Sequence, residues 1–239
     1  MVSRIDVVAL AACLLLATGV ACSRGDSVVQ QAVPAPDAKT QGPAIVPSAK
    51  DDARPKIVVL GDSLTAGLGL VETQSYPGLL QSKIDQDGFE FEVINGGVSG
   101  DTSAGGLRRL DWLLTNDVQV LIVALGGNDG LRGLSVAEMK ENLAQIIETA
   151  RDKHITVILA GMEAPPNFGM EYSAAFRQTF QQLALKYRVP FIPFLLDKVA
   201  GQAALNQADG IHPNAQGAAI VADTVWNVLK PVLDQLSSS

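Results

Sequence analysis

Cysteine and histidine are scarce in this chain of 239 residues. The two cysteines, Cys13 and Cys22, both precede residue 23, so the rest of the chain has neither a disulfide nor a thiolate metal site. Thiol redox chemistry is therefore excluded. The two histidines are His154 and His212, so a mechanism that needs an imidazole base has two candidates.

An excess of positive charge is also lacking. The chain has 18 Lys and Arg against 25 Asp and Glu, a net charge of −7, and so no basic surface for a phosphate backbone. We expect no nucleic-acid partner. Hydrophobic residues make up 47% and charged residues only 18%, which is typical of a packed globular protein. The length favours one domain with a single core.

The longest apolar run covers residues 7–20 and follows a start that carries Arg4. It is shorter than the roughly 20 residues that span a bilayer, and small residues lead from it to Cys22. These features predict a cleaved export signal over residues 1–21. The segment resembles a bacterial lipoprotein signal, although Gly19 stands where that pattern usually has Leu or Val. The resemblance implies lipidation of Cys22 and a periplasmic protein anchored to a bacterial membrane; the alternative is a free periplasmic protein.

Residues 22–55 are rich in Ser, Gln, Ala and Pro and follow neither a helical nor a strand period. This composition predicts a disordered linker, which is either a spacer that holds an enzyme away from a membrane or a leader of no consequence. The folded domain is expected over residues 56–239.

Beyond the linker, short apolar runs alternate with amphipathic ones. We predict strands at residues 56–60, 89–94, 118–125, 155–160 and 190–195, and helices at 77–87, 103–114, 173–187 and from Asn214 to about 236. A further helix begins after Ser135, which forms a capping box with Glu138. Such alternation is typical of a parallel sheet covered on both faces. The predicted class is α/β, a three-layer α/β/α sandwich with a parallel five-stranded sheet.

Polar and glycine residues collect in four loops of this scheme, at residues 61–67, 95–103, 126–130 and 209–214. Taken singly, each loop is explained as a turn or a helix cap. A nucleotide site is weakly supported, because the loops have neither dinucleotide spacing nor a Walker lysine. Ligands of parallel sheets bind beyond the carboxyl ends of the strands, so these loops are expected to meet there.

Together the loops supply the groups that acyl transfer needs. A serine nucleophile needs a base, and the base needs a carboxylate that fixes its tautomer. Ser63, His212 and Asp209 can fill these roles. The oxyanion needs neutral donors, which the backbone N–H groups of Ser63 and Gly100 and the side chain of Asn128 can provide. His154 precedes a strand at the opposite end of the sheet and is interpreted as a surface residue.

The motifs resemble those of the SGNH (GDSL) hydrolases, in particular the bacterial thioesterase, lysophospholipase and arylesterase branch. They are Gly61-Asp62-Ser63-Leu64, Ser99-Gly100-Asp101-Thr102-Ser103, Gly126-Gly127-Asn128-Asp129-Gly130-Leu131-Arg132-Gly133 and Asp209-Gly210-Ile211-His212-Pro213-Asn214, in the family's order. The resemblance covers residue 56 to the C-terminus. It implies a flavodoxin-like sandwich, a Ser63–His212–Asp209 triad, an oxyanion hole of Ser63, Gly100 and Asn128, and no metal or organic cofactor.

The substrate is expected to be a small-molecule acyl ester, with thioesters and lysophospholipids as further candidates. We assign substrate contacts to Asp62, Leu131, Pro165 and Phe168, and the apolar groove is expected to draw also on Leu68, Leu70, Pro166 and Met170. Three alternatives stay open: a carbohydrate acetyl esterase, an acyltransferase, and a non-enzymatic lipoprotein module that binds acyl chains or cell-wall polymer. Membrane contact is expected only through the lipid anchor, and the sequence leaves the oligomeric state open.

Overall fold

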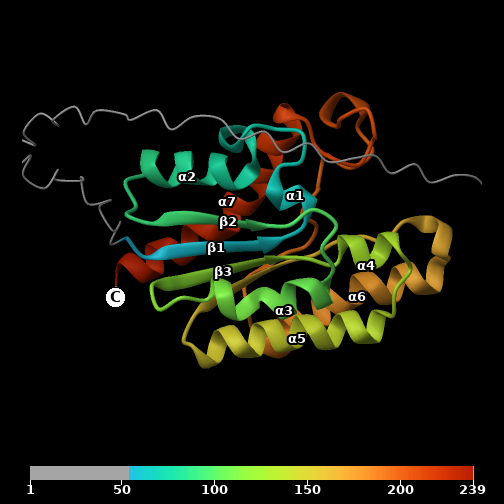
Figure 1. The fold of residues 1–239 in the computed structure, drawn as a ribbon, viewed down its shortest axis with the longest axis horizontal. Coiled ribbons are helices and arrows are strands. Elements are labelled where there is room, and N and C mark those ends of the chain that lie inside the picture. Colours follow the sequence, from blue (N-terminus) through green and yellow to red (C-terminus); the bar gives the residue numbers. More distant parts are fainter. Residues whose placement is uncertain (1–53, 239) are drawn as a thin grey trace, which may run out of the picture. The chain divides into compact units, whose positions relative to one another are not determined.

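The computed structural model describes residues 54–238. The predicted signal peptide, Cys22 and all of the predicted linker up to residue 53 lie outside the described residues. The described part contains a five-stranded parallel sheet in the order β2-β1-β3-β4-β5, shown in Figure 1. Its strands are β1 (Lys56–Gly61), β2 (Glu92–Gly97), β3 (Val118–Ala124), β4 (Thr156–Ala160) and β5 (Phe191–Ile192).

Helices cover both faces of this sheet (Figure 1). On one face lie α2 (Tyr76–Gln86) and α7 (Ala215–Ser237), and on the other lie α3 (Ser103–Leu113), α5 (Val136–Asp152) and α6 (Met170–Tyr187). The short helices are α1 (Ser63–Ala66) and α4 (Gly127–Leu131), with single 3-10 turns at η1 (Glu72–Gln74), η2 (Pro166–Phe168) and η3 (Ala203–Leu205). The predicted three-layer α/β/α class is confirmed.

The two central strands explain why the sheet needs both helical layers. Residues 57–60 of β1 and 120–123 of β3 are all at most 1% exposed, so side chains on both faces of each strand are buried. These runs are apolar without alternation, as strands of a covered parallel sheet are. They form one core with the apolar stripes of the surrounding helices, such as Leu143, Ile146 and Ile147 of α5.

Two helices begin at the capping residues that the sequence indicates. The Ser135 hydroxyl accepts from the Glu138 N–H at the start of α5, and the Asn214 side chain accepts from the Gln216 and Gly217 N–H groups at the start of α7. Helix α7 continues through Pro231 to Ser237. Within residues 54–238 no helix is both long enough and apolar enough to cross a membrane.

The bounds of three predicted elements are wrong by more than one residue. The second strand, predicted at residues 89–94, occupies Glu92–Gly97 as β2. It starts later because the Phe89 N–H still bonds to the Ile84 carbonyl and closes α2, and it ends later because residues 95–97 pair with β1. The fifth strand is reduced from residues 190–195 to Phe191–Ile192, because the next bond after that from the Gly161 N–H to the Ile192 carbonyl comes from the Leu195 N–H and leaves the regular ladder. Helix α6 begins at Met170 rather than residue 173.

Candidate active site

Ser63 lies where β1 gives way to α1. Asp62 caps this short helix, because its carboxylate accepts the Leu64 N–H at 3.0 Å. The cap places Ser63 at the first helical position, beyond the carboxyl end of the interior strand β1, where parallel sheets bind ligands. Ser63 is only 8% exposed overall, yet its hydroxyl reaches the wall of a cleft.

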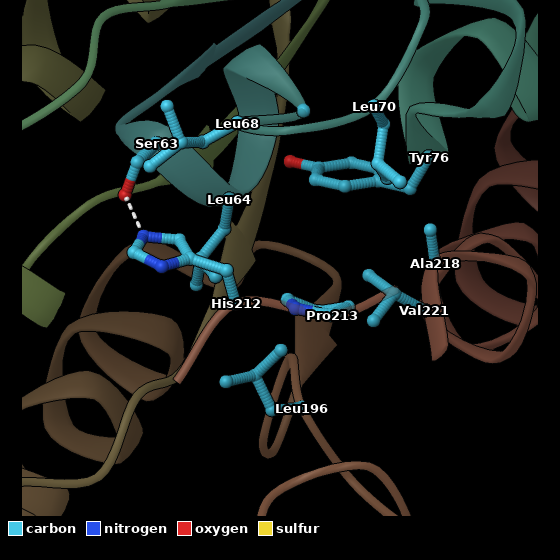
Figure 2. A pocket seen from close by; sticks show the side chains of 11 residues that line it. Ser63, Leu64, Leu68, Leu70, Tyr76, Leu196, His212, Pro213, Ala218 and Val221 are labelled. Atoms are coloured by element: carbon cyan, nitrogen blue, oxygen red, sulfur yellow. Dashed lines mark hydrogen bonds between the residues drawn. The ribbon is translucent and has the colours of Figure 1, made fainter. Parts of the chain in front are cut away.

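His212 and Asp209 reach Ser63 from the loop before α7. The Ser63 Oγ lies 2.9 Å from His212 Nε2 (Figure 2), and His212 Nδ1 lies 2.7 Å from Asp209 Oδ2. A carboxylate only accepts hydrogen bonds, so Nδ1 carries the proton and Nε2 accepts from the serine hydroxyl. The three side chains thus form one line of hydrogen bonds between segments 149 residues apart.

The Asp209 carboxylate is held in its charged form. The backbone N–H groups of His212 and Ile211 both donate to Oδ1, at 3.0 and 2.9 Å, and the His212 ring donates to Oδ2. These bonds lower the pKa of Asp209 to about 2, and the bond from the His212 backbone N–H has the largest effect. Asp209 is therefore ionised throughout the neutral range and able to stabilise a positive charge on His212.

Gly100 and Asn128 come to the same cleft from the loops after β2 and β3. Gly100 has a backbone φ of +81°, a conformation that residues other than glycine rarely adopt. Asn128 lies in α4, and its amide donates one N–H to Asp62 Oδ2 at 3.1 Å. Since an amide nitrogen carries two protons, Asn128 retains a second donor.

Asp62 is the anchor of that amide, and it is 3% exposed. Burial raises its pKa to about 6, against the lowering effects of the Leu64 N–H and the Asn128 amide. These two donors engage both carboxylate oxygens, and the residue also lines the cleft. The assignment of Asp62 to substrate contact stays a prediction, and its hydrogen bonds connect it to the serine helix and to Asn128.

A second set of bonds ties the Gly100 loop to its neighbours. The Asp129 carboxylate accepts from both the backbone N–H and the hydroxyl of Ser103, at 2.9 and 2.6 Å. The Arg109 guanidinium joins the Asp101 carboxylate at 2.7 Å to the Gly61 carbonyl at 2.8 Å. The three loops that carry Ser63, Gly100 and Asn128 are therefore braced against one another, which favours fixed donor positions.

The family follows from this chain's match to a known sequence pattern. Residues 59–220 match the model of the GDSL-like Lipase/Acylhydrolase family, which is more than half of the chain. The chain belongs to the GDSL-like lipase/acylhydrolase family. Membership makes it an enzyme of the carboxylic ester hydrolase class, which confirms the predicted family and sets the non-enzymatic binding module aside.

Characterised relatives cover most of this GDSL hydrolase. It is 40% identical to Esterase TesA of Pseudomonas aeruginosa over 191 residues, 80% of this chain and 95% of the relative. It is 35% identical to Thioesterase 1/protease 1/lysophospholipase L1 of Escherichia coli over 179 residues, 74% and 85% of the two chains. A crystal structure of the psychrotrophic esterase EstA from Pseudoalteromonas sp., inhibited by monoethylphosphonate, matches with a TM-score of 0.71 and 34% identity over 75% of this chain and 99% of that one.

The cleft of this GDSL hydrolase has a volume of about 640 Å³ and mostly apolar walls. Leu131 and Pro165 line it, as do Leu68 and Pro166. Phe168 is absent from the lining, since its ring packs on that of Tyr172 with centroids 5.4 Å apart, and Met170 is 90% exposed outside the cleft. Further apolar walls that the sequence interpretation did not name are Met162, Ala164, Phe194, Leu196, Ala200 and Ile211.

A small apolar chamber of about 10 Å³ lies behind Ser63 and His212 (Figure 2). Leu70 lines this chamber rather than the main cleft. Tyr76 also lines it, and its buried hydroxyl forms a 2.6 Å hydrogen bond with Thr65 Oγ1 on α1. The bond ties the serine helix to α2.

The second histidine takes no part in the site. His154 is exposed in the turn between α5 and β4, at the amino end of that strand, as the sequence predicts. Within residues 54–238 no group of three or more His, Cys, Asp or Glu side chains is arranged to hold a metal ion.

Proposed function

We propose that this enzyme hydrolyses carboxylic esters through a Ser63–His212–Asp209 triad and an acyl-enzyme intermediate. The observation that carries the proposal is the line of 2.9 and 2.7 Å contacts from Ser63 through His212 to Asp209 at the wall of an apolar cleft. Nucleophile, base and orienting carboxylate are the three parts that serine acyl transfer requires.

In the first step Ser63 Oγ attacks the carbonyl carbon while His212 Nε2 takes the hydroxyl proton. The carbonyl electron pair moves to oxygen, and the Ser63 and Gly100 N–H groups and the free Asn128 N–H donate to this oxyanion. The tetrahedral intermediate then collapses. The bond to the leaving alcohol or thiol breaks, and His212 returns its proton to the leaving group.

In the second step a water molecule attacks the acyl-enzyme. His212 takes a proton from the water, the same donors hold the second oxyanion, and the released serine recovers its proton. Asp209 stays ionised in both steps, in keeping with its lowered pKa, and stabilises the positive imidazolium each time.

The proposed substrate class is an acyl ester with a short to medium chain, with acyl thioesters and lysophospholipids as further substrates. A cleft of about 640 Å³ is within the range of small-molecule sites and exceeds what an acetyl group fills. The relatives named esterase, thioesterase and lysophospholipase support this range. Acetylated sugars and transfer to an alcohol acceptor are the competing outcomes.

The assay that tests this proposal measures turnover of p-nitrophenyl esters from acetate to palmitate, and of acyl-CoA thioesters, by the full chain. We expect an optimum at a chain longer than acetate and loss of activity by ~10⁴-fold or more in Ser63→Ala and His212→Ala. If the enzyme hydrolysed acetylated sugars alone, the proposed substrate class would be wrong and the enzyme would be a carbohydrate acetyl esterase. Undiminished turnover by Ser63→Ala would overturn the mechanism.

We further propose export with cleavage after residue 21 and lipidation of Cys22, because the apolar run of residues 7–20 is followed by small residues and a cysteine. Residues 22–55 would then act as the linker to the domain of residues 56–239. Metabolic labelling with a palmitate analogue tests this. We expect label on the wild type and none on Cys22→Ser, and equal labelling of both would refute it.

A further inference from the structure

The loop that carries Asp209 and His212 is weakly embedded in the protein. The Asp209 side chain is 44% exposed, and residues 208–211 are all exposed. Nevertheless His212 must hold its ring within hydrogen-bond distance of Ser63. A misplacement of about 1 Å in such a pair can cost ~10²-fold in rate. Other contacts must therefore fix the loop.

Gln207 makes three of these contacts. Its backbone N–H donates to the His212 carbonyl at 2.7 Å. Its side-chain amide nitrogen donates to the Pro213 carbonyl at 3.0 Å and to the Leu68 carbonyl at 2.6 Å. The first two bonds close the loop around His212, while the third crosses 139 positions of sequence to the serine side of the cleft.

The third bond leads directly to the nucleophile's own backbone. The Leu68 N–H donates to the Ser63 carbonyl at 3.1 Å, in the turn that ends α1. A path of backbone and amide hydrogen bonds thus joins His212 to Ser63 through Gln207 and Leu68. This path is separate from the 2.9 Å contact between the reacting atoms.

The serine side is shaped to receive the glutamine. Gly69 has a φ of +79°, and a Cβ on it would lie 2.3 Å from Gln207 Oε1. No side chain fits at this position while the Gln207 amide stays in place. The absence of a side chain at Gly69 therefore allows the amide to lie against the serine loop.

We propose that Gln207 is a positioning residue of the hydrolytic reaction, whose side-chain amide fixes the distance and angle between His212 and Ser63. The proposal rests on the triad assigned above. It concerns the rate of the chemical step and not substrate binding, because Gln207 does not line the cleft.

The test compares Gln207→Ala and Gln207→Glu in the full chain. The Glu variant keeps the shape but turns the two amide bonds into contacts between a carboxylate and two carbonyl oxygens. The Ala variant leaves those carbonyls to water. We expect kcat for p-nitrophenyl esters to fall roughly 10-fold in the Ala variant and on the order of 10²-fold in the Glu variant, with KM within about twofold of wild type.

A loss of volume alone would give the reverse order, since Ala removes more atoms than Glu. The rate of fluorophosphonate labelling should fall by the same factors as kcat, because labelling uses the same activated serine. Gln202→Glu is the matched control: Gln202 is an exposed glutamine five positions earlier that is outside the cleft lining, and its variant should keep wild-type constants. Thermal unfolding of each variant establishes the folded fraction, to which the rates are normalised.

Gly69→Ala approaches the same contact from the other side. We expect its effect on kcat to be far from additive with that of Gln207→Ala, because both changes break one contact. Wild-type kcat and labelling rate in both Gln207 variants, or a loss that vanishes on normalisation to folded protein, would overturn the proposal. Ser63→Ala run in parallel separates the failures: if it stays active the triad itself is wrong, whereas an inactive Ser63→Ala beside fully active Gln207 variants refutes only the positioning role.

Discussion

The buried carboxylate of Asp62 should make the protein's stability depend on pH in a way that one substitution removes. Burial raises the Asp62 pKa from an ordinary 3.8 to about 6, because the site excludes water from a group that is 3% exposed. The folded state then binds the proton more tightly than the unfolded chain does. Asp62 therefore does not lower the free energy of unfolding well below pH 3.8, where the carboxyl is protonated in both states. The free energy of unfolding falls as the pH rises from 3.8 to 6, and the loss stays constant above pH 6.

The magnitude follows from the shift. About two pKa units at 1.36 kcal/mol each give roughly 3 kcal/mol of lost stability above pH 6. In Asp62→Asn the ionisable group is gone, so this loss disappears. The variant has one side-chain acceptor oxygen where Asp62 has two, for the Leu64 N–H and the Asn128 amide, but the cost of the lost acceptor is the same at both ends of the pH range. Only the pH-dependent part reports on the buried charge.

Urea denaturation of wild type and Asp62→Asn at pH 4 and pH 7.5 measures the effect. We expect the difference in unfolding free energy, variant minus wild type, to move by about 2.5 kcal/mol in favour of the variant between the two pH values, since about 0.5 kcal/mol of the loss is already present at pH 4. Asp111→Asn, an exposed change on α3, should show no such movement. A difference that stays constant within about 1 kcal/mol would refute the claim that Asp62 is a destabilised buried carboxylate.

Three other substitutions test separate parts of the structure. Asn128→Ala should lower kcat of the folded enzyme by roughly 10²–10³-fold, because it removes one oxyanion donor; an unchanged kcat would exclude that role. Ala200→Trp should place an indole on the cleft wall and shift the ester optimum toward acetate, and an unchanged chain-length profile would place the acyl chain elsewhere. Leu80→Ala should cost about 2–5 kcal/mol in urea denaturation, because Leu80 is fully buried, while leaving the kinetic constants of the folded enzyme intact.

The strands could be predicted from the sequence where both of their faces are buried. Strands β1 and β3 are apolar on both faces, so their runs stand out. The end of β2 could not be predicted in this way. Asn95, Gly96 and Gly97 have the composition of a loop, yet they pair with β1. A Cβ on Gly97 would lie 2.1 Å from the Ala66 N, so the glycine reflects close packing of α1 on the strand and not a turn.

In the candidate site, the catalytic residues could be predicted from the sequence, whereas most of the cleft walls could not. Ser63, Asp209 and His212 were found because each stands in a short motif and their chemistry fits together. The positions of the cleft walls depend on how distant loops pack, so Phe194, Leu196 and Ile211 carried no local signal. Phe168, chosen from a loop motif, packs instead on Tyr172. Gln207 was missed because a single glutamine acquires meaning only when Leu68 is seen beside it.

The most direct test of the central claim is the intact mass of the full chain after reaction with a fluorophosphonate, followed by mapping of the modified peptide. We expect one phosphonyl group per molecule, on the peptide that contains Ser63, with esterase activity lost in proportion to labelling. Ser63→Ala should take up no label and remain folded. A phosphonyl group on another residue, or full labelling of Ser63→Ala, would contradict the assignment of Ser63 as the nucleophile.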